Sequence, residues 1–183
     1  MDEDCLYLNI WAPAEGQTGL PVFVWYFGGG LQAGSTSEME FDGERIARRG
    51  VVVVTINYRL NVFGFLAHPE LTVQAPGSPT NFGFLDQQFA TRWVKRNIAA
   101  FGGNPNNITI GGQSAGGMSV SAQIAHLGNE GLFCRGVIIS GLFAPVYPEM
   151  LGLCVPLGEA EKRGELFFRD VLGVQNLEEA RHV

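Results

Sequence analysis

Residues 51–57 have the sequence VVVVTIN, a run that is β-branched and apolar on both sides of an extended chain. A strand of this kind has no side that can face water, so helices must cover both faces of its sheet. Further apolar runs of strand length are LYLNIW at residues 6–11, VFVWYF at 22–27, and NITIGG and GVIIS later in the chain. The pattern predicts a buried, mostly parallel sheet.

Helix-forming segments separate these strands, which predicts an α/β fold built from crossover units. In the segment 86–97 we expect Phe89, Trp93 and Val94 to face inward. The proline- and glycine-rich segment HPELTVQAPGSPTNFG is expected to be a long loop, and residues 1–183 a single domain. The expected helices are 41–49, 86–97, 114–127 and 159–172.

Composition argues against several classes of function. The net charge is −6 and the 12 Lys and Arg residues form no stripe, so we expect no nucleic-acid partner. The longest apolar run is too short to cross a bilayer, so we expect no transmembrane segment. Three cysteines, Cys5, Cys134 and Cys154, match no zinc or CxxC spacing, so we expect no metal or cofactor. Met1 is followed by acidic residues rather than by a signal peptide, which leaves the compartment open.

The stretch GGQSAGG, residues 111–117, places a serine in a glycine-rich turn. A G-x-S-x-G turn between a strand and a helix is typical of a nucleophile elbow, in which a strained serine stands clear of the sheet. Its position after NITI and before a helical segment favours this interpretation. The alternative is a glycine-rich turn that contains an incidental serine.

A second glycine-rich stretch, YFGGGLQAGS, follows the apolar run at residues 22–27. Acyl transfer requires backbone N–H groups aimed at an oxygen that becomes negative, and glycines let the backbone approach the reacting carbon. In hydrolases these donors come from such a loop and from the residue after the serine, here Ala115. A phosphate-binding loop is disfavoured because the Lys-Ser/Thr ending is absent. A flexible surface turn remains an alternative.

Several long motifs, in order, resemble the type-B carboxylesterase family of cholinesterases and fungal lipases. They are EDCLYLNIWAP, GGGLQAGS, NYRLNVFGFLA, LFCRGVIISG, and the long segment that begins NFGFLDQQFATRWVKRNIAAFGG and ends at the serine turn. The resemblance covers nearly the whole chain. It implies a partial α/β-hydrolase fold, a mostly parallel central sheet flanked by helices, with N-terminal and C-terminal segments missing.

The resemblance also implies roles for individual residues. Ser114 would be the nucleophile, and the N–H groups of Gly29, Gly30 and Ala115 would form the oxyanion hole. Arg59 and Asp86 would form a buried structural ion pair, although Asp86 taken alone would suggest an exposed helix N-cap.

The sequence departs from the family pattern in ways that matter for activity. Gln113 replaces the glutamate that usually precedes the serine, and the usual partner of Cys5 would precede Met1, so we expect Cys5 to be a free thiol. The family's catalytic Glu and His would lie beyond Val183. The histidines present are poor substitutes. His68 is expected at the surface, and His126 at the far end of the serine helix, about 18 Å from Ser114. His182 is expected to lie in a frayed terminus.

Two functions from different classes follow. The favoured one is the N-terminal and central portion of a serine carboxylester hydrolase, with little or no activity as an isolated chain and a neutral, apolar ester as substrate. The alternative is a non-catalytic, cholinesterase-like binding protein. An intact serine turn favours the hydrolase. Family members are often secreted, but the chain itself assigns no compartment.

Overall fold

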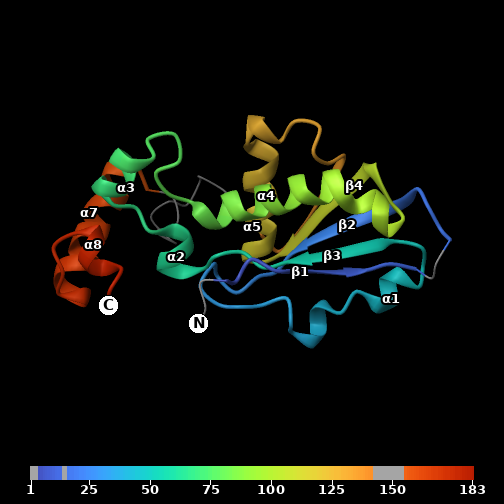
Figure 1. The fold of residues 1–183 in the computed structure, drawn as a ribbon, viewed down its shortest axis with the longest axis horizontal. Coiled ribbons are helices and arrows are strands. Elements are labelled where there is room, and N and C mark those ends of the chain that lie inside the picture. Colours follow the sequence, from blue (N-terminus) through green and yellow to red (C-terminus); the bar gives the residue numbers. More distant parts are fainter. Residues whose placement is uncertain (1–3, 14–15, 142–154) are drawn as a thin grey trace. The chain divides into compact units, whose positions relative to one another are not determined.

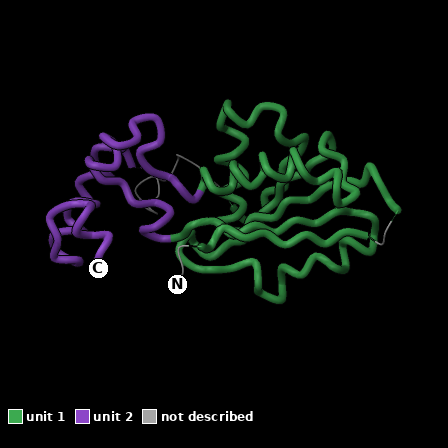
Figure 2. Tube along the Cα trace, viewed as in Figure 1, with its two compact units in different colours: residues 1–60, 84–143 green, residues 61–83, 144–183 purple. Residues whose placement is uncertain are grey.

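The computed structural model describes residues 4–13, 16–141 and 155–183. The chain divides into two compact units, which Figure 2 distinguishes by colour. Unit 1 comprises residues 1–60 and 84–143, and unit 2 comprises residues 61–83 and 144–183. That the whole chain folds as a single domain stays a prediction.

Unit 1 is built on a mixed sheet whose described strands follow the order β1-β3-β2-β4-β5 (Figure 1). Strand β1 runs antiparallel to β3, and every other adjacent pair is parallel. The predicted mostly parallel sheet is therefore confirmed. The strands are β1 (Leu8–Trp11), β2 (Leu20–Tyr26), β3 (Val52–Ile56), β4 (Gly103–Gln113) and β5 (Arg135–Ile139).

Helices cover both faces of this sheet, with α4 and α5 on one side and α1 on the other (Figure 1). The segment 41–49 was expected to form one helix, but only residues 44–47 are α-helical, and Phe41 ends a separate short 3₁₀ helix. Gly43, between the two elements, lies against Trp11 and Val53, where a β-carbon would come within 2.8 Å of both side chains. The helical elements that lie wholly or mainly in unit 1 are η1 (Met39–Phe41), α1 (Glu44–Ala47), α4 (Phe82–Asn97), η2 (Ile98–Phe101), α5 (Ala115–Ala125) and η3 (Leu127–Asn129).

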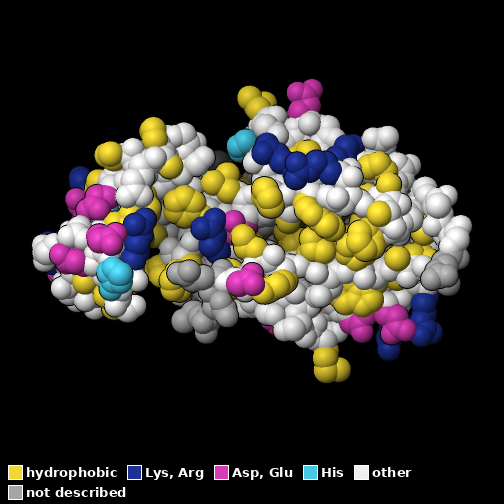
Figure 3. Space-filling model, in the orientation of Figure 1, with side chains coloured by type: hydrophobic (Ala, Val, Ile, Leu, Met, Phe, Trp, Pro, Cys, Tyr) yellow, Lys and Arg dark blue, Asp and Glu magenta, His cyan; other side chains and the backbone are white. Residues whose placement is uncertain are grey.

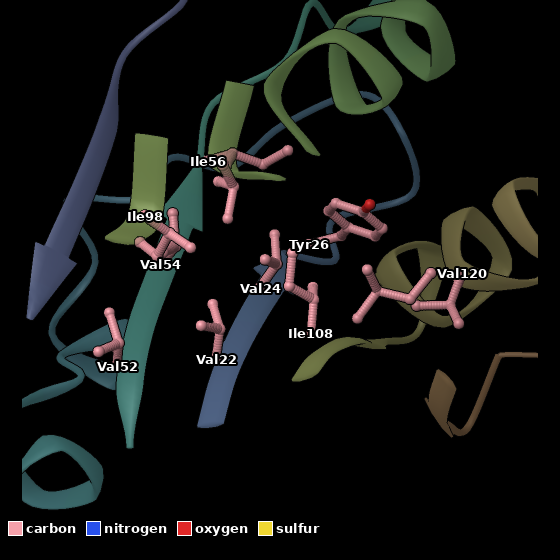
Figure 4. Packing of buried hydrophobic residues seen from close by; sticks show 11 residues of the cluster. Val22, Val24, Tyr26, Val52, Val54, Ile56, Ile98, Ile108 and Val120 are labelled. Atoms are coloured by element: carbon pink, nitrogen blue, oxygen red, sulfur yellow. The ribbon is translucent and has the colours of Figure 1, made fainter. Parts of the chain in front are cut away.

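The core of unit 1 lies between the sheet and its helices α4 and α5 (Figure 4). All five residues of β3 are buried, as the VVVVTIN run requires. Alternate residues of β2 point into the same core, which matches one face of a pleated strand. The buried cluster consists of Val22, Val24, Tyr26, Val52, Val54, Ile56, Val94, Ile98, Ile108, Ile110 and Val120.

The inner face of α4 differs from the one expected. Val94 is fully buried and Trp93 packs partly against the core, but Phe89 is 63% exposed, so its prediction was wrong. The buried face instead carries Gln87 and Thr91, whose side chains hydrogen-bond Ser119 and Tyr26. Because paired polar residues occupy inward positions of α4, the spacing of its apolar residues alone does not indicate which face is buried. Figure 3 shows further hydrophobic side chains at the surface of unit 1.

Unit 2 is helical in its described residues, and it corrects two predictions. The proline-rich segment contains the helix α3, and His68 is buried rather than exposed. The imidazole caps α3, with Nδ1 accepting a hydrogen bond from the Glu70 N–H, and it stacks on Phe168 at 4.4 Å. The elements are α2 (Asn61–Phe65), α3 (Pro69–Gln74), α7 (Leu157–Phe167), the π-helix η4 (Phe168–Leu172) and α8 (Leu177–Ala180).

The state of the cysteines and the hydropathy of the helices bear on two further predictions. Cys5 is a free thiol, which confirms its prediction, and Cys134 is also free, whereas Cys154 lies outside the described residues. Within the described ranges, none of the helices combines the length and the apolar character that crossing a membrane demands.

The backbone of α5 passes very close to the carboxyl ends of β2 and β4. A β-carbon placed on Gly116 would collide with the Tyr26 carbonyl oxygen and lie 2.9 Å from that of Phe27. A β-carbon on Gly112 would collide with the backbone of Gly116. Glycine at both positions therefore permits the helix to pack directly on the strand ends.

We expect Gly116→Ala to lower the free energy of unfolding by about 3 kcal/mol or more, because the added methyl group meets backbone that cannot rotate away. The matched control is Gly77→Ala, where nothing lies within 4 Å and the backbone is ordinary. Urea denaturation followed by circular dichroism compares the two. Equal unfolding midpoints for the two variants would contradict this packing.

Candidate active site

Ser114 lies in the turn between β4 and α5, at the carboxyl end of a central strand. Its φ is 54° and its ψ −123°, a conformation that non-glycine residues rarely adopt. The Ser114 N–H donates to the Ile139 carbonyl at 2.9 Å, and the Met118 N–H donates to the Ser114 carbonyl at 3.0 Å. These bonds hold a strained, half-buried serine at the strand end, which is the geometry of a nucleophile elbow.

The sheet register places the segment after β2 beside this turn. Tyr26 pairs with Gly112, so the residues that follow each strand emerge side by side. A β-carbon on Gly28 would lie 2.8 Å from the Gln113 carbonyl oxygen and 3.3 Å from the Ser114 β-carbon. Only glycine fits there without a shift. Sequence reasoning did not single out Gly28, although the run of three glycines was a signal for it.

Residues 28–35, which we call the glycine loop, fold into a tight turn. Gly29 and Gly30 have φ values of 106° and 66°, and the N–H groups of Gln32 and Ala33 both donate to the Gly29 carbonyl at 3.1 Å. A β-carbon on Gly29 would collide with the Ala33 carbonyl oxygen. The turn leaves both of these glycines, the two predicted oxyanion donors from the loop, exposed to solvent.

Ala115, the third predicted donor, is the first residue of α5 and is 1% exposed. The first N–H groups of a helix have no partner within the helix and carry the positive end of its dipole. Ser114, Ala115 and the glycine loop thus gather at one edge of the sheet. Such an arrangement can direct N–H donors at a negative oxygen that develops beside the serine.

Arg59 and Asp86 form an ion pair within unit 1. Nε and Nη2 of Arg59 donate to the two carboxylate oxygens at 2.8 Å each, and the Arg59 N–H donates to Oδ2 at 3.0 Å. The Asp86 side chain is 6% exposed, and its hydrogen bonds raise the pKa of the Arg59 guanidinium above its ordinary value. Asp86 therefore lies inside α4 rather than at an exposed N-cap.

No histidine of the described residues hydrogen-bonds the Ser114 hydroxyl. His126 ends α5, at the opposite end of the helix from the serine. Its Nδ1 accepts from the Gly128 N–H at 3.0 Å and contacts Gln88. His68 is buried within unit 2, and His182 pairs with Glu178 in an exposed position.

The described side chains also bear on whether the chain could hold a metal ion. In the part of the chain that the structure describes, His, Cys, Asp and Glu side chains form no group of three or more that could hold an ion. The chemistry available at this edge of the sheet is that of a hydroxyl and backbone N–H groups.

Comparisons with known proteins show which family the chain resembles. A family model described as "Carboxylesterase family" matches residues 1–149. Fumonisin B1 esterase of Sphingopyxis macrogoltabida is 46% identical over 147 residues, which cover 79% of this chain and 27% of the relative. Cholinesterase of Mus musculus is 48% identical over 142 residues, covering 77% and 23% of the two chains. Para-nitrobenzyl esterase of Bacillus subtilis (strain 168) is 47% identical over 140 residues, covering 76% and 28%.

Solved structures show the same fold. One titled PNB esterase superposes with a TM-score of 0.83 at 39% identity, and covers 98% of this chain and 36% of that one. A thermophilic PNB esterase gives a TM-score of 0.84 at 38% identity, with 99% and 35% coverage. The chain spans between 23% and 28% of the length of the three curated relatives above. Its sequence, fold and serine turn all lead to one assignment: the chain belongs to the carboxylesterase family.

Proposed function

We propose that this chain provides the nucleophile and the oxyanion hole of a serine carboxylester hydrolase. Ser114 is the residue that becomes acylated, and the N–H groups of Gly29, Gly30 and Ala115 bind the oxyanion. The observation that carries the proposal is the strained backbone of Ser114, held directly beside Gly28 of the glycine loop. A surface turn with an incidental serine would need neither the strain nor the glycine contact.

The chemistry requires two half-reactions. The Ser114 Oγ attacks the ester carbonyl carbon while a base takes its proton, and the carbonyl oxygen becomes an oxyanion that accepts hydrogen bonds from the N–H groups. Collapse of this intermediate releases the alcohol, which receives the proton, and leaves an acyl-serine. Water then attacks the acyl carbon in the same way and releases the acid.

The base and its orienting carboxylate are the parts that the described residues do not supply. His126 and His68 are engaged elsewhere, and His182 is paired with Glu178. The relatives are several times longer than the region this chain matches. We therefore propose that both groups belong to polypeptide other than residues 1–183.

The purified 183-residue chain is expected to show only trace hydrolysis of p-nitrophenyl acetate, because a serine hydroxyl without a base is a weak nucleophile. Residual catalysis from the oxyanion hole alone is about 10³–10⁴-fold over water, orders of magnitude below an intact site. A fluorophosphonate probe is expected to label the chain slowly, on Ser114. Initial rates and intact-mass analysis measure the two effects.

Ser114→Ala is expected to abolish the slow labelling, and Ser121→Ala is the control, since its hydroxyl only bonds the Gly117 carbonyl within α5. Labelling that persists in Ser114→Ala would refute the nucleophile. Fast turnover with stoichiometric labelling, both lost in Ser114→Ala, would show that a base lies within the chain.

The substrate proposed is a neutral, apolar ester. Gln113 is exposed next to the serine and keeps hydrogen-bonding capacity without the negative charge of the glutamate that the family resemblance leads us to expect. A cationic head group would lose an attractive charge at this position.

A full-length enzyme containing this chain is therefore expected to have a higher kcat/KM for p-nitrophenyl butyrate than for butyrylthiocholine. Gln113→Glu should narrow the difference by raising kcat/KM for the choline ester, because it restores the charge. Steady-state kinetics on both substrates test this. A wild-type preference for the choline ester would rule the proposal out.

A further inference from the structure

Asn57 and Tyr58, the two residues that follow β3, contact opposite ends of the glycine loop. The loop lies between Phe27, which follows β2, and the buried Thr36. Neither residue belongs to the proposed nucleophile or oxyanion hole. Their contacts nevertheless lie at the two ends of the loop that carries Gly29 and Gly30, the proposed oxyanion donors.

Tyr58 contacts the start of the loop. Its Oη donates to the Phe27 carbonyl at 2.7 Å, and its ring stacks on the Phe27 ring with centroids 4.5 Å apart. Tyr58 is 3% exposed and Phe27 is 1% exposed. Burial raises the pKa of the Tyr58 hydroxyl well above its ordinary value, so the group remains a donor at neutral pH. The Phe27 carbonyl shares a rigid peptide plane with the Gly28 N–H, so this hydrogen bond fixes the direction in which the loop leaves the strand.

Asn57 contacts the end of the loop. Its side-chain Oδ1 accepts a hydrogen bond from the Thr36 N–H at 2.9 Å. The backbone N–H of Asn57 donates to the Tyr7 carbonyl at 2.8 Å. Two adjacent side chains thus hold the two ends of an eight-residue segment whose glycines would otherwise be conformationally free.

The loop also packs on the ring that Tyr58 supports. A β-carbon on Gly34 would lie 2.7 Å from the Phe27 ring and 3.1 Å from the Gly28 carbonyl oxygen. The returning half of the loop therefore rests on Phe27, and Phe27 rests on Tyr58.

The support behind these two residues is rigid. Arg59, the next residue, is fixed by its three hydrogen bonds to Asp86, and all of β3 before them is buried. A displacement of the loop ends would therefore have to break the contacts made by Asn57 and Tyr58, rather than move the strand that precedes these two residues.

We propose that Asn57 and Tyr58 are positioning residues that clamp the glycine loop, at Phe27 and Thr36, against the serine turn. The inference rests on the proposed function, since it assigns them the task of holding Gly29 and Gly30 where an oxyanion would form. They act through the loop and touch no reacting atom.

Amide hydrogen exchange on the 183-residue chain tests the clamp, resolved to residues 28–36. The amides of Gln32, Ala33 and Thr36 are hydrogen-bonded and report on loop opening. Tyr58→Phe should accelerate their exchange about threefold to tenfold, the range expected for one lost buried hydrogen bond. Tyr26→Phe is the control, because it removes an equally buried hydroxyl bonded to Thr91 on α4, away from the loop.

A second pair of variants separates positioning from general stability. Asn57→Ala removes the acceptor for the Thr36 N–H and should accelerate exchange in the loop, whereas Asn57→Asp retains an acceptor oxygen and should restore protection. This pair carries the test if Tyr58→Phe does not fold.

Acceleration confined to residues 28–36 in Tyr58→Phe and Asn57→Ala, and absent in Tyr26→Phe and Asn57→Asp, supports the clamp. Unchanged loop exchange, or equal acceleration in the loop and in β2, overturns it. So does an Asn57→Asp variant that exchanges as fast as Asn57→Ala. Exchange does not depend on esterase activity, so the clamp and the proposed function can fail separately.

Discussion

The backbone-to-backbone approach of α5 to the ends of β2 and β4 is the constraint on which the rest of unit 1 depends. A β-carbon on Gly116 would collide with the Tyr26 carbonyl oxygen, and a β-carbon on Gly112 would collide with the backbone of Gly116. The helix can then begin immediately after the strand, which forces Ser114 into its unusual φ and ψ. The same approach places the serine next to the segment that follows β2. Strain, packing and the candidate site therefore have one physical cause.

A buried polar network stabilises the pairing of α4 and α5 that this approach requires. Gln87 Nε2 donates to the Ser119 Oγ at 2.9 Å, and Gln123 Nε2 donates to Gln87 Oε1 at 3.2 Å. Asn129 Nδ2 donates to Gln123 Oε1 at 2.7 Å, and Gln88 Nε2 donates to Asn129 Oδ1 at 2.6 Å. Buried polar groups that satisfy one another specify a single packing, because any shift would leave several of them unpaired.

Sequence patterns predicted the elements whose burial is apolar and missed those whose burial is polar. The run VVVVTIN predicted a fully covered strand, and β3 is one. Phe89 was misplaced because Gln87 occupies the buried face of α4, and His68 was misplaced because its ring caps a helix that no apolar period indicates. Tyr58 gave no signal, since its role comes from a contact with a distant strand end that only the folded chain creates.

The candidate site depends on contact between the glycine loop and the serine turn. A nuclear Overhauser effect between the Gly28 α-protons and the Ser114 β-protons measures this directly, because a β-carbon at Gly28 would lie 3.3 Å from that of Ser114. A strong cross-peak is expected in the folded chain. Its absence, while cross-peaks between paired residues of β2 and β4 such as Val24 and Ile110 are present, would show that the loop and the turn are not in contact.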